Sequence, residues 1–215
     1  MKGLILKDLY TLRQMGKVYL ISMVCLMAWG MVVHNSTMFT SLLLVYGLMI
    51  LITTASWDEV SHFNGYALTF PLSPKKLVQA KYLFALILFA AITVLGVLGG
   101  FGMTAALGAK SEIGYGEVVV STLSISCIYL MTAVVVLPCN YKFGVEKSRF
   151  LFVAIYLIIF ACFALLFSID HMKQWLLNLG AREFMMGVAV FGVLTLLGMI
   201  FSYRISVRIM ENREW

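Results

Sequence analysis

The chain has 215 residues, of which 62% are hydrophobic and only 12% are charged, and its mean hydropathy is +0.96. Soluble domains have about 45–50% apolar and about 25% charged residues, so this composition excludes a soluble globular protein and indicates an integral membrane protein. The formal net charge of +6 does not indicate nucleic-acid binding. We expect the positive side chains at the rim of a membrane domain, where they also attract anionic lipid.

Six apolar runs are long enough to cross a bilayer as helices, at residues 18–33, 38–57, 82–109, 118–138, 150–169 and 184–203. A spanning helix needs about 20 such residues to cross about 30 Å of hydrocarbon. No run alternates with the two-residue period of a membrane barrel. The sequence therefore predicts an all-α membrane protein, with residues 1–215 forming a single transmembrane domain of six helices.

Lysine and arginine are distributed unevenly between the two sides of these spans. Thirteen lie on the side of the termini and three on the other side. The thirteen are Lys2, Lys7, Arg13, Lys17, Lys75, Lys76, Lys81, Lys142, Lys147, Arg149, Arg204, Arg208 and Arg213, and the three are Lys110, Lys173 and Arg182. Because positive residues stay in the cytoplasm, both termini are predicted to be cytoplasmic.

Residues 1–17 form a predicted amphipathic helix ahead of the first span. Ile5, Leu9 and Leu12 fall on one face, and Lys7 and Lys17 fall on the other. Such a helix lies in the membrane interface, with its lysines toward the lipid headgroups. The alternative is a simple positively charged anchor.

Residues 58–81 form the longest connection on the side of the termini, and we name this segment the elbow. Ser73 and Pro74 predict the start of a helix that runs into the third span, because serine caps helices and proline fits their first position. Pro71 predicts a corner before it. Glu59, Phe63 and Tyr66 recur at helical spacing as an acidic and aromatic face. The alternative is a hairpin that only reverses the chain.

The stretch "LPCNYKFGVEKSR" follows the fourth span on the same side as the elbow. Pro138 is expected to end or kink that span, and Gly144 permits a turn. The tip carries Lys142, Glu146, Lys147 and Arg149. In the third span, Gly96 and Gly100 have the Gly-x-x-x-Gly spacing that permits close helix packing.

No catalytic, cofactor or metal site is predicted in this chain. Glu59 and His62 have Glu-x-x-His spacing, but a bundle metal site needs two such pairs. Residues 102–111 lack the spacing and the lysine of a phosphate-binding loop. The spans also lack the midplane charge that ion-coupled carriers use. Any transport must therefore draw its energy from another protein.

Three stretches carry a resemblance to a known family: "MKGLILKDLYTLRQ", "YALTFPLSPKKLVQAKYL" and "LPCNYKFGVEKSR". With the six-span layout, the chain resembles a type-2 ABC transporter permease, the small membrane subunit of Gram-positive bacteria that works with a separate ATPase. The resemblance implies a dimer with an identical or related chain in the bacterial cytoplasmic membrane. It also implies cytoplasmic ATPase subunits that bind ATP and magnesium, with residues 1–17 as the connecting helix.

The resemblance also implies where the ATPase docks. Carried over by position, the main contact comprises Glu59, Phe63, Tyr66, Pro71, Pro74, Lys75 and Lys76, and a smaller one comprises Lys142, Phe143, Glu146 and Lys147. The cargo it implies is hydrophobic or amphipathic, such as a peptide toxin, an antimicrobial peptide or a drug. Two alternatives stay open: a secondary carrier, and a non-transporting immunity or assembly protein.

Overall fold

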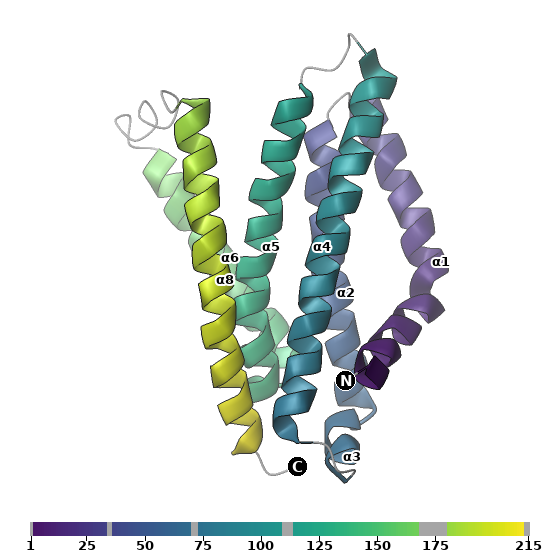
Figure 1. Ribbon diagram of the computed structural model, residues 1–215, viewed down its shortest axis with the longest axis vertical. Helices are drawn as coiled ribbons and strands as arrows, with labels where there is room; N and C mark the ends of the chain where they lie inside the picture. The colour runs from purple at the N-terminus through teal and green to yellow at the C-terminus, as the bar shows by residue number, and fades with distance from the viewer. Residues whose placement is uncertain (1, 34–35, 70–72, 109–113, 168–179, 213–215) are drawn as a thin grey trace.

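A computed structural model describes residues 2–33, 36–69, 73–108, 114–167 and 180–212. Its helices are α1 (Lys2–Val33), α2 (Ser36–Val60), α3 (Phe63–Thr69), α4 (Pro74–Leu107), α5 (Tyr115–Phe143), α6 (Val145–Phe167) and α8 (Ala181–Glu211). The long helices run along the length of the molecule (Figure 1). The described residues contain no strand, so the predicted all-α class is confirmed.

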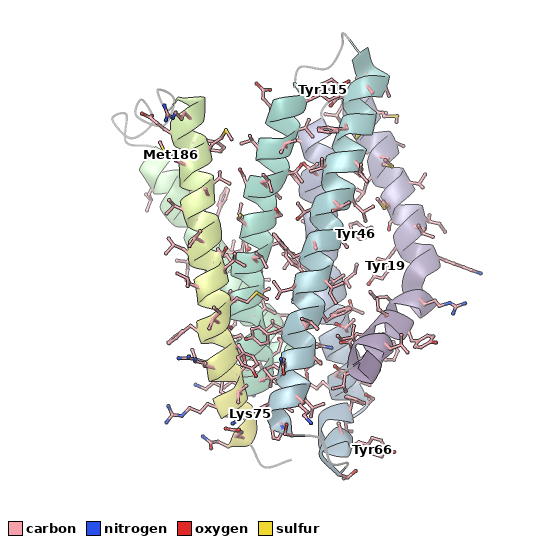
Figure 2. The ribbon with its side chains drawn as sticks, in the orientation of Figure 1. Tyr19, Tyr46, Tyr66, Lys75, Tyr115 and Met186 are labelled. Carbon is pink, nitrogen blue, oxygen red and sulfur yellow. The ribbon has the colours of Figure 1, made fainter. Side chains whose placement is uncertain are left out.

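Helix α5 lies at the centre of the bundle. It packs against α2, α4, α6 and α8, and α1 packs against α2 and α4 on one side. Phe39, Phe84 and Tyr129 are among the largest fully buried side chains. The rings of Tyr19 on α1 and Tyr46 on α2, labelled in Figure 2, meet edge to face with their centroids 6.1 Å apart.

The outer faces of the bundle are apolar. Exposed side chains include Val18, Leu20 and Ile21 on α1, and Phe160 on α6. A soluble protein rarely exposes a contiguous apolar surface of this extent, whereas lipid tails cover it at no cost. Among the described residues, five helices are long and apolar enough to cross a membrane: α1 from Gly16, α2 from Thr37, α4, α5 and α8 from Arg182.

The fifth predicted span in chain order, residues 150–169, is not among these five helices and falls largely on α6. This helix has 23 residues, and its sequence is mostly apolar. The predicted end of this span, residues 168 and 169, lies outside the described residues. The count of six spans therefore stays a prediction.

Helix α1 differs from the sequence prediction of a separate interfacial helix and span. It is continuous from Lys2 to Val33. Figure 1 shows that it bends, so that its first turns lean across the bundle. The start of α1, α3 and the end of α8 lie toward the same end of the molecule (Figure 1), which we name the α3 end.

Pro138 was expected to end or kink the fourth span, and helix α5 runs through it to Phe143, so it does not end the helix. Proline cannot donate a backbone hydrogen bond to the carbonyl of Val134, four residues earlier. The Ser202 hydroxyl on α8 donates to that carbonyl at 2.6 Å instead. Tyr82 on α4 in turn bonds Ser202, with the two hydroxyl oxygens 2.6 Å apart. A neighbouring side chain thus satisfies the group that the proline leaves without a partner.

Gly96 and Gly100 lie where α4 meets α5. A Cβ atom at Gly100 would lie 2.5 Å from Cγ1 of Val118, and one at Gly96 would lie 2.9 Å from Cγ2 of Thr122. Real Cβ atoms do not approach other atoms this closely, so both positions require glycine for the observed helix spacing. The β-branched Val118 has little rotamer freedom with which to move away.

We expect the variant Gly100→Ala to lower the free energy of unfolding by about 1–3 kcal/mol, because the added methyl group overpacks the contact between α4 and α5. Gly102→Ala is the matched control on the same helix, since nothing lies within 4 Å of its Cβ position. There the better helix propensity of alanine is expected to stabilise the protein by up to about 1 kcal/mol. Thermal unfolding in detergent micelles measures both, and equal effects of the two variants would contradict the packing.

Candidate functional site

The last turn of α2 carries two adjacent carboxylates, Asp58 and Glu59, that bind different parts of the bundle. Asp58 accepts a hydrogen bond from Nζ of Lys7 on α1 and another, at 2.6 Å, from Nζ of Lys81 on α4. Lys81 also donates to Oδ1 of Asp8 on α1, at 3.1 Å. We name Lys7, Asp8, Asp58 and Lys81 the charge cluster.

The charge cluster is balanced and largely buried, with its Lys7 and Asp58 side chains 30% and 14% exposed. Asp8 is only 3% exposed and Lys81 only 7% exposed. Two lysines and two aspartates leave no net charge, and each lysine lies within 4 Å of both carboxylates. An unpaired buried charge costs several kcal/mol, so each member requires the others. The cluster therefore fastens α1, α2 and α4 together at the α3 end.

The charge cluster also reaches α3. Nζ of Lys7 lies 3.7 Å from the centroid of the Phe63 ring, a cation–π contact. The expectation that Lys7 points toward lipid headgroups was therefore wrong. Asp8 shares a helix face with Leu4 and Leu12, which pack against the core, so this face of α1 points inward.

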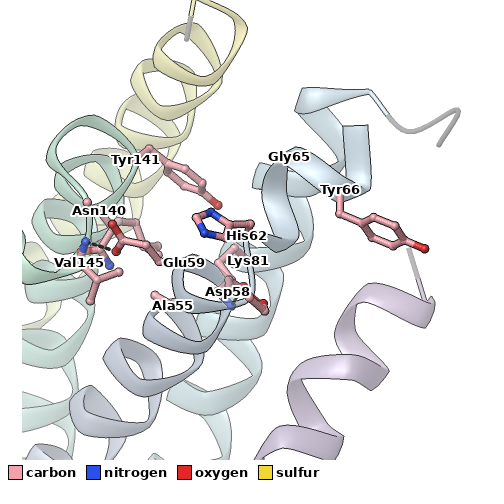
Figure 3. A pocket seen from close by; sticks show the side chains of 13 residues that line it. Ala55, Asp58, Glu59, His62, Gly65, Tyr66, Lys81, Asn140, Tyr141 and Val145 are labelled. Carbon is pink, nitrogen blue, oxygen red and sulfur yellow. Dashed lines mark hydrogen bonds and ion pairs between the residues drawn. The ribbon is translucent and has the colours of Figure 1, made fainter. Parts of the chain in front are cut away.

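Glu59 joins the end of α2 to the start of α6. Its Oε2 accepts a hydrogen bond from the backbone N–H of Val145 at 2.5 Å, drawn as a dashed line in Figure 3. A carboxylate is favoured there because the first amides of a helix carry partial positive charge. Nη2 of Arg149 donates to Oγ of Ser56 at 2.7 Å and forms a second link between these helices.

Gly144 makes this junction possible. Its φ of +82° lies in the left-handed region that favours glycine. A Cβ atom at this position would lie 2.5 Å from Oε1 of Glu59. The turn predicted at Gly144 is therefore present, and it brings together two connections that the sequence suggested only as separate loops.

A cavity of about 680 Å³ opens between the end of α2, α3 and the turn between α5 and α6. Its lining includes Glu59, His62, Asn140 and Tyr141 (Figure 3). His62 has φ of +49°, the one left-handed residue other than glycine in the described parts of the chain. Such backbone strain costs about 1–3 kcal/mol and is concentrated at functional positions.

The other elbow residues predicted to dock an ATPase have different surroundings. Tyr66 is 62% exposed, and Figure 3 shows it pointing away from the other labelled cavity residues. Phe63 lies beneath Lys7 and packs against the core. Pro71 lies outside the described residues.

Pro74 begins α4, as predicted, but the Ser73 side chain makes no capping hydrogen bond, so that part of the expectation was wrong. Lys76 is exposed, and Nζ of Lys75 lies 3.6 Å from Oε1 of Glu211 on α8. In the second connection, all four residues predicted to contact the ATPase are exposed: Lys142, Phe143, Glu146 and Lys147.

The charge cluster was not predicted from the sequence. Asp58 and Lys81 fall at the two ends of the predicted elbow, Lys81 on its predicted helix, but the sequence assigns no contact between them and no role to Asp8. The signal was present in Asp8, because an aspartate four residues from both Leu4 and Leu12 lies on an apolar face and requires a buried cation. Among the described residues, no group of three or more histidine, cysteine or acidic side chains could hold a metal ion.

Comparison with known sequences decides the family. The profile described as ABC-2 family transporter protein matches residues 3–211. The chain belongs to this family. Searches of curated proteins and of solved structures find no match. This ABC-2 protein is therefore a multi-pass membrane component of ABC transport with a permease role, and its charge cluster and cavity are features of that permease.

We expect Lys81→Met to destabilise this ABC-2 protein by about 3–5 kcal/mol, because it leaves two buried carboxylates with one lysine between them. Lys75→Met is the matched control, since the pair between Lys75 and Glu211 is exposed and such pairs contribute at most about 1 kcal/mol. The thermal unfolding temperatures of the two variants, measured in detergent, distinguish these two effects. Equal, small effects would show that the cluster is not buried as described.

Proposed function

We propose that this chain is the permease subunit of an ATP-driven exporter and that a separate cytoplasmic ATPase moves it through the α3 end. The observation that supports this most directly is the linkage of the end of α2 to its neighbours. Asp58 bonds α1 and α4, and Glu59 bonds α6. Among the residues described, the helices that surround α3 are thus joined by direct polar contacts.

The proposed transmission is mechanical. The ATPase contacts the exposed surface of α3 and the start of α4, which includes Tyr66 and Lys76. Because Lys7 contacts both Phe63 and Asp58, a displacement of α3 passes to α1 as well as to α2. Packed elements joined in this way move as rigid bodies rather than deform continuously.

The rest of the assembly follows from this role. The positive residues on the side of the termini favour a cytoplasmic α3 end. The membrane is then the cytoplasmic membrane of a bacterium, and the small permeases that the chain resembles come from Gram-positive bacteria. ATP and magnesium are bound by the ATPase, and a second permease chain, identical or related, completes a dimer. The charge-poor spans, rich in Met, Phe and Leu, support a hydrophobic or amphipathic cargo that is exported from the inner leaflet or the cytoplasm.

The test is purification of the tagged chain from its native membrane in mild detergent, followed by mass spectrometry and measurement of ATP hydrolysis. We expect the wild-type chain to bring down an ABC ATPase. The double variant Tyr66→Ala, Lys76→Glu is expected to retain about a tenth of it or less, since exposed aromatic anchors carry much of an interface's energy.

Phe160→Ala is the matched control, because this aromatic side chain is also exposed but lies on α6, outside α3 and α4. It is expected to retain the ATPase in full. Absence of an ABC ATPase from the wild-type preparation, or full retention by the Tyr66 and Lys76 double variant, would contradict the proposed coupling. Ion-driven transport by the chain alone would instead support a secondary carrier.

A further inference from the structure

The cavity at the α3 end has the size of a ligand site. Its volume of about 680 Å³ lies within the range of roughly 300–1,000 Å³ that is typical of small-molecule pockets. Apolar side chains of α2, α5 and α6 form part of its wall, namely Ala55, Leu137 and Val145. Such a volume accommodates a whole small molecule rather than a single side chain of a neighbouring protein.

The wall of the cavity carries one uncompensated negative charge. Asp58 and Lys81 line it, but both belong to the balanced charge cluster. Glu59 also lines it, and in the described part of the chain no cation pairs with this carboxylate. Its Oε2 accepts from the Val145 N–H, and the residue is exposed. A bound cation would therefore meet a fixed, accessible carboxylate.

The wall also holds a polar group that needs a partner. Both polar atoms of the Asn140 side-chain amide are buried, and neither has a hydrogen-bond partner within the described residues. A buried amide without a partner costs free energy, so its presence beside a cavity favours a ligand with hydrogen-bonding groups. His62 and Tyr141 add aromatic rings, and in Figure 3 the hydroxyl end of Tyr141 points toward His62.

We propose that this cavity binds an organic cation, an ammonium or guanidinium group on an apolar body, with Glu59 opposite the charge. Aromatic and aliphatic walls suit the body, and charge-assisted hydrogen bonds to a carboxylate suit the head. The cavity lies at the ends of α2 and α5, where a molecule from the cytoplasm would enter the bundle. The identification of this ligand as exported cargo rests on the proposed function, whereas its binding does not.

The binding test uses the full chain in lipid nanodiscs, without ATPase or ATP. The probe is dansylcadaverine, which has a naphthalene ring, an alkyl chain and a primary ammonium group, and whose fluorescence reports an apolar environment. Its neutral control is the same molecule with a hydroxyl in place of the amine. Empty nanodiscs of the same lipid give the background from partitioning. We expect saturable binding of the amine and at least about tenfold weaker binding of the alcohol.

Two variants separate ligand contact from structural support. Glu59→Gln keeps a side-chain oxygen for the Val145 N–H but removes the charge, and it is expected to weaken amine binding about tenfold. Asn140→Leu is expected to weaken binding about fivefold while the unfolding temperature holds or rises, because it removes a polar group without a partner. A purely structural role for Asn140 predicts a lower unfolding temperature instead.

Arg149→Ala is the matched control, since it removes the hydrogen bond to Ser56 at the same helix junction without touching the cavity. Its affinity for the amine is expected to equal that of the wild type. Equal affinity for the amine and the alcohol, or an unchanged affinity in Glu59→Gln, would overturn the proposal. Either result leaves the ATPase experiment unaffected, so failure of this site and failure of the coupling are distinguishable.

Discussion

The pairing of Asp58 with two lysines is the interaction on which the α3 end depends. It holds Lys7 of α1 and Lys81 of α4 against the last turn of α2. The neighbouring Glu59 binds the opposite side, at the start of α6. Adjacent helical residues point about 100° apart, so one turn of α2 reaches two sides of the bundle. A buried, balanced cluster tolerates little displacement of any member, which makes this junction stiff.

Helix positions were largely predictable from the sequence because they depend on local properties. Apolar runs placed the long helices, and Pro74 placed the start of α4. The site was harder to predict because its contacts join distant residues: Lys81 and Asp8 are 73 positions apart, and Glu59 and Val145 are 86 apart. Pro138 shows the same limit, since its tolerance inside α5 depends on Ser202 from another helix.

Glu59 belongs both to the junction between α2 and α6 and to the wall of the cavity, so ligand binding can affect helix packing in a permease. Glu59 caps α6 and also supplies the net charge of the cavity wall. A cation bound beside it would compete with the α6 amides for the same carboxylate. Ligand binding and the packing of α2 on α6 would then be coupled, as transport requires when occupancy of a site must be sensed by the moving elements.

Asp58 holds the start of α1 and the start of α4 together as one body. The most direct measurement of this linkage is the distance distribution between spin labels at the exposed positions Tyr10 and Lys76, in a chain whose native cysteines are replaced by serine. We predict a narrow distribution that broadens in Asp58→Asn and stays narrow in Glu211→Gln, which breaks only an exposed pair. A broad distribution in the parent chain, or an equally narrow one in Asp58→Asn, would contradict the account.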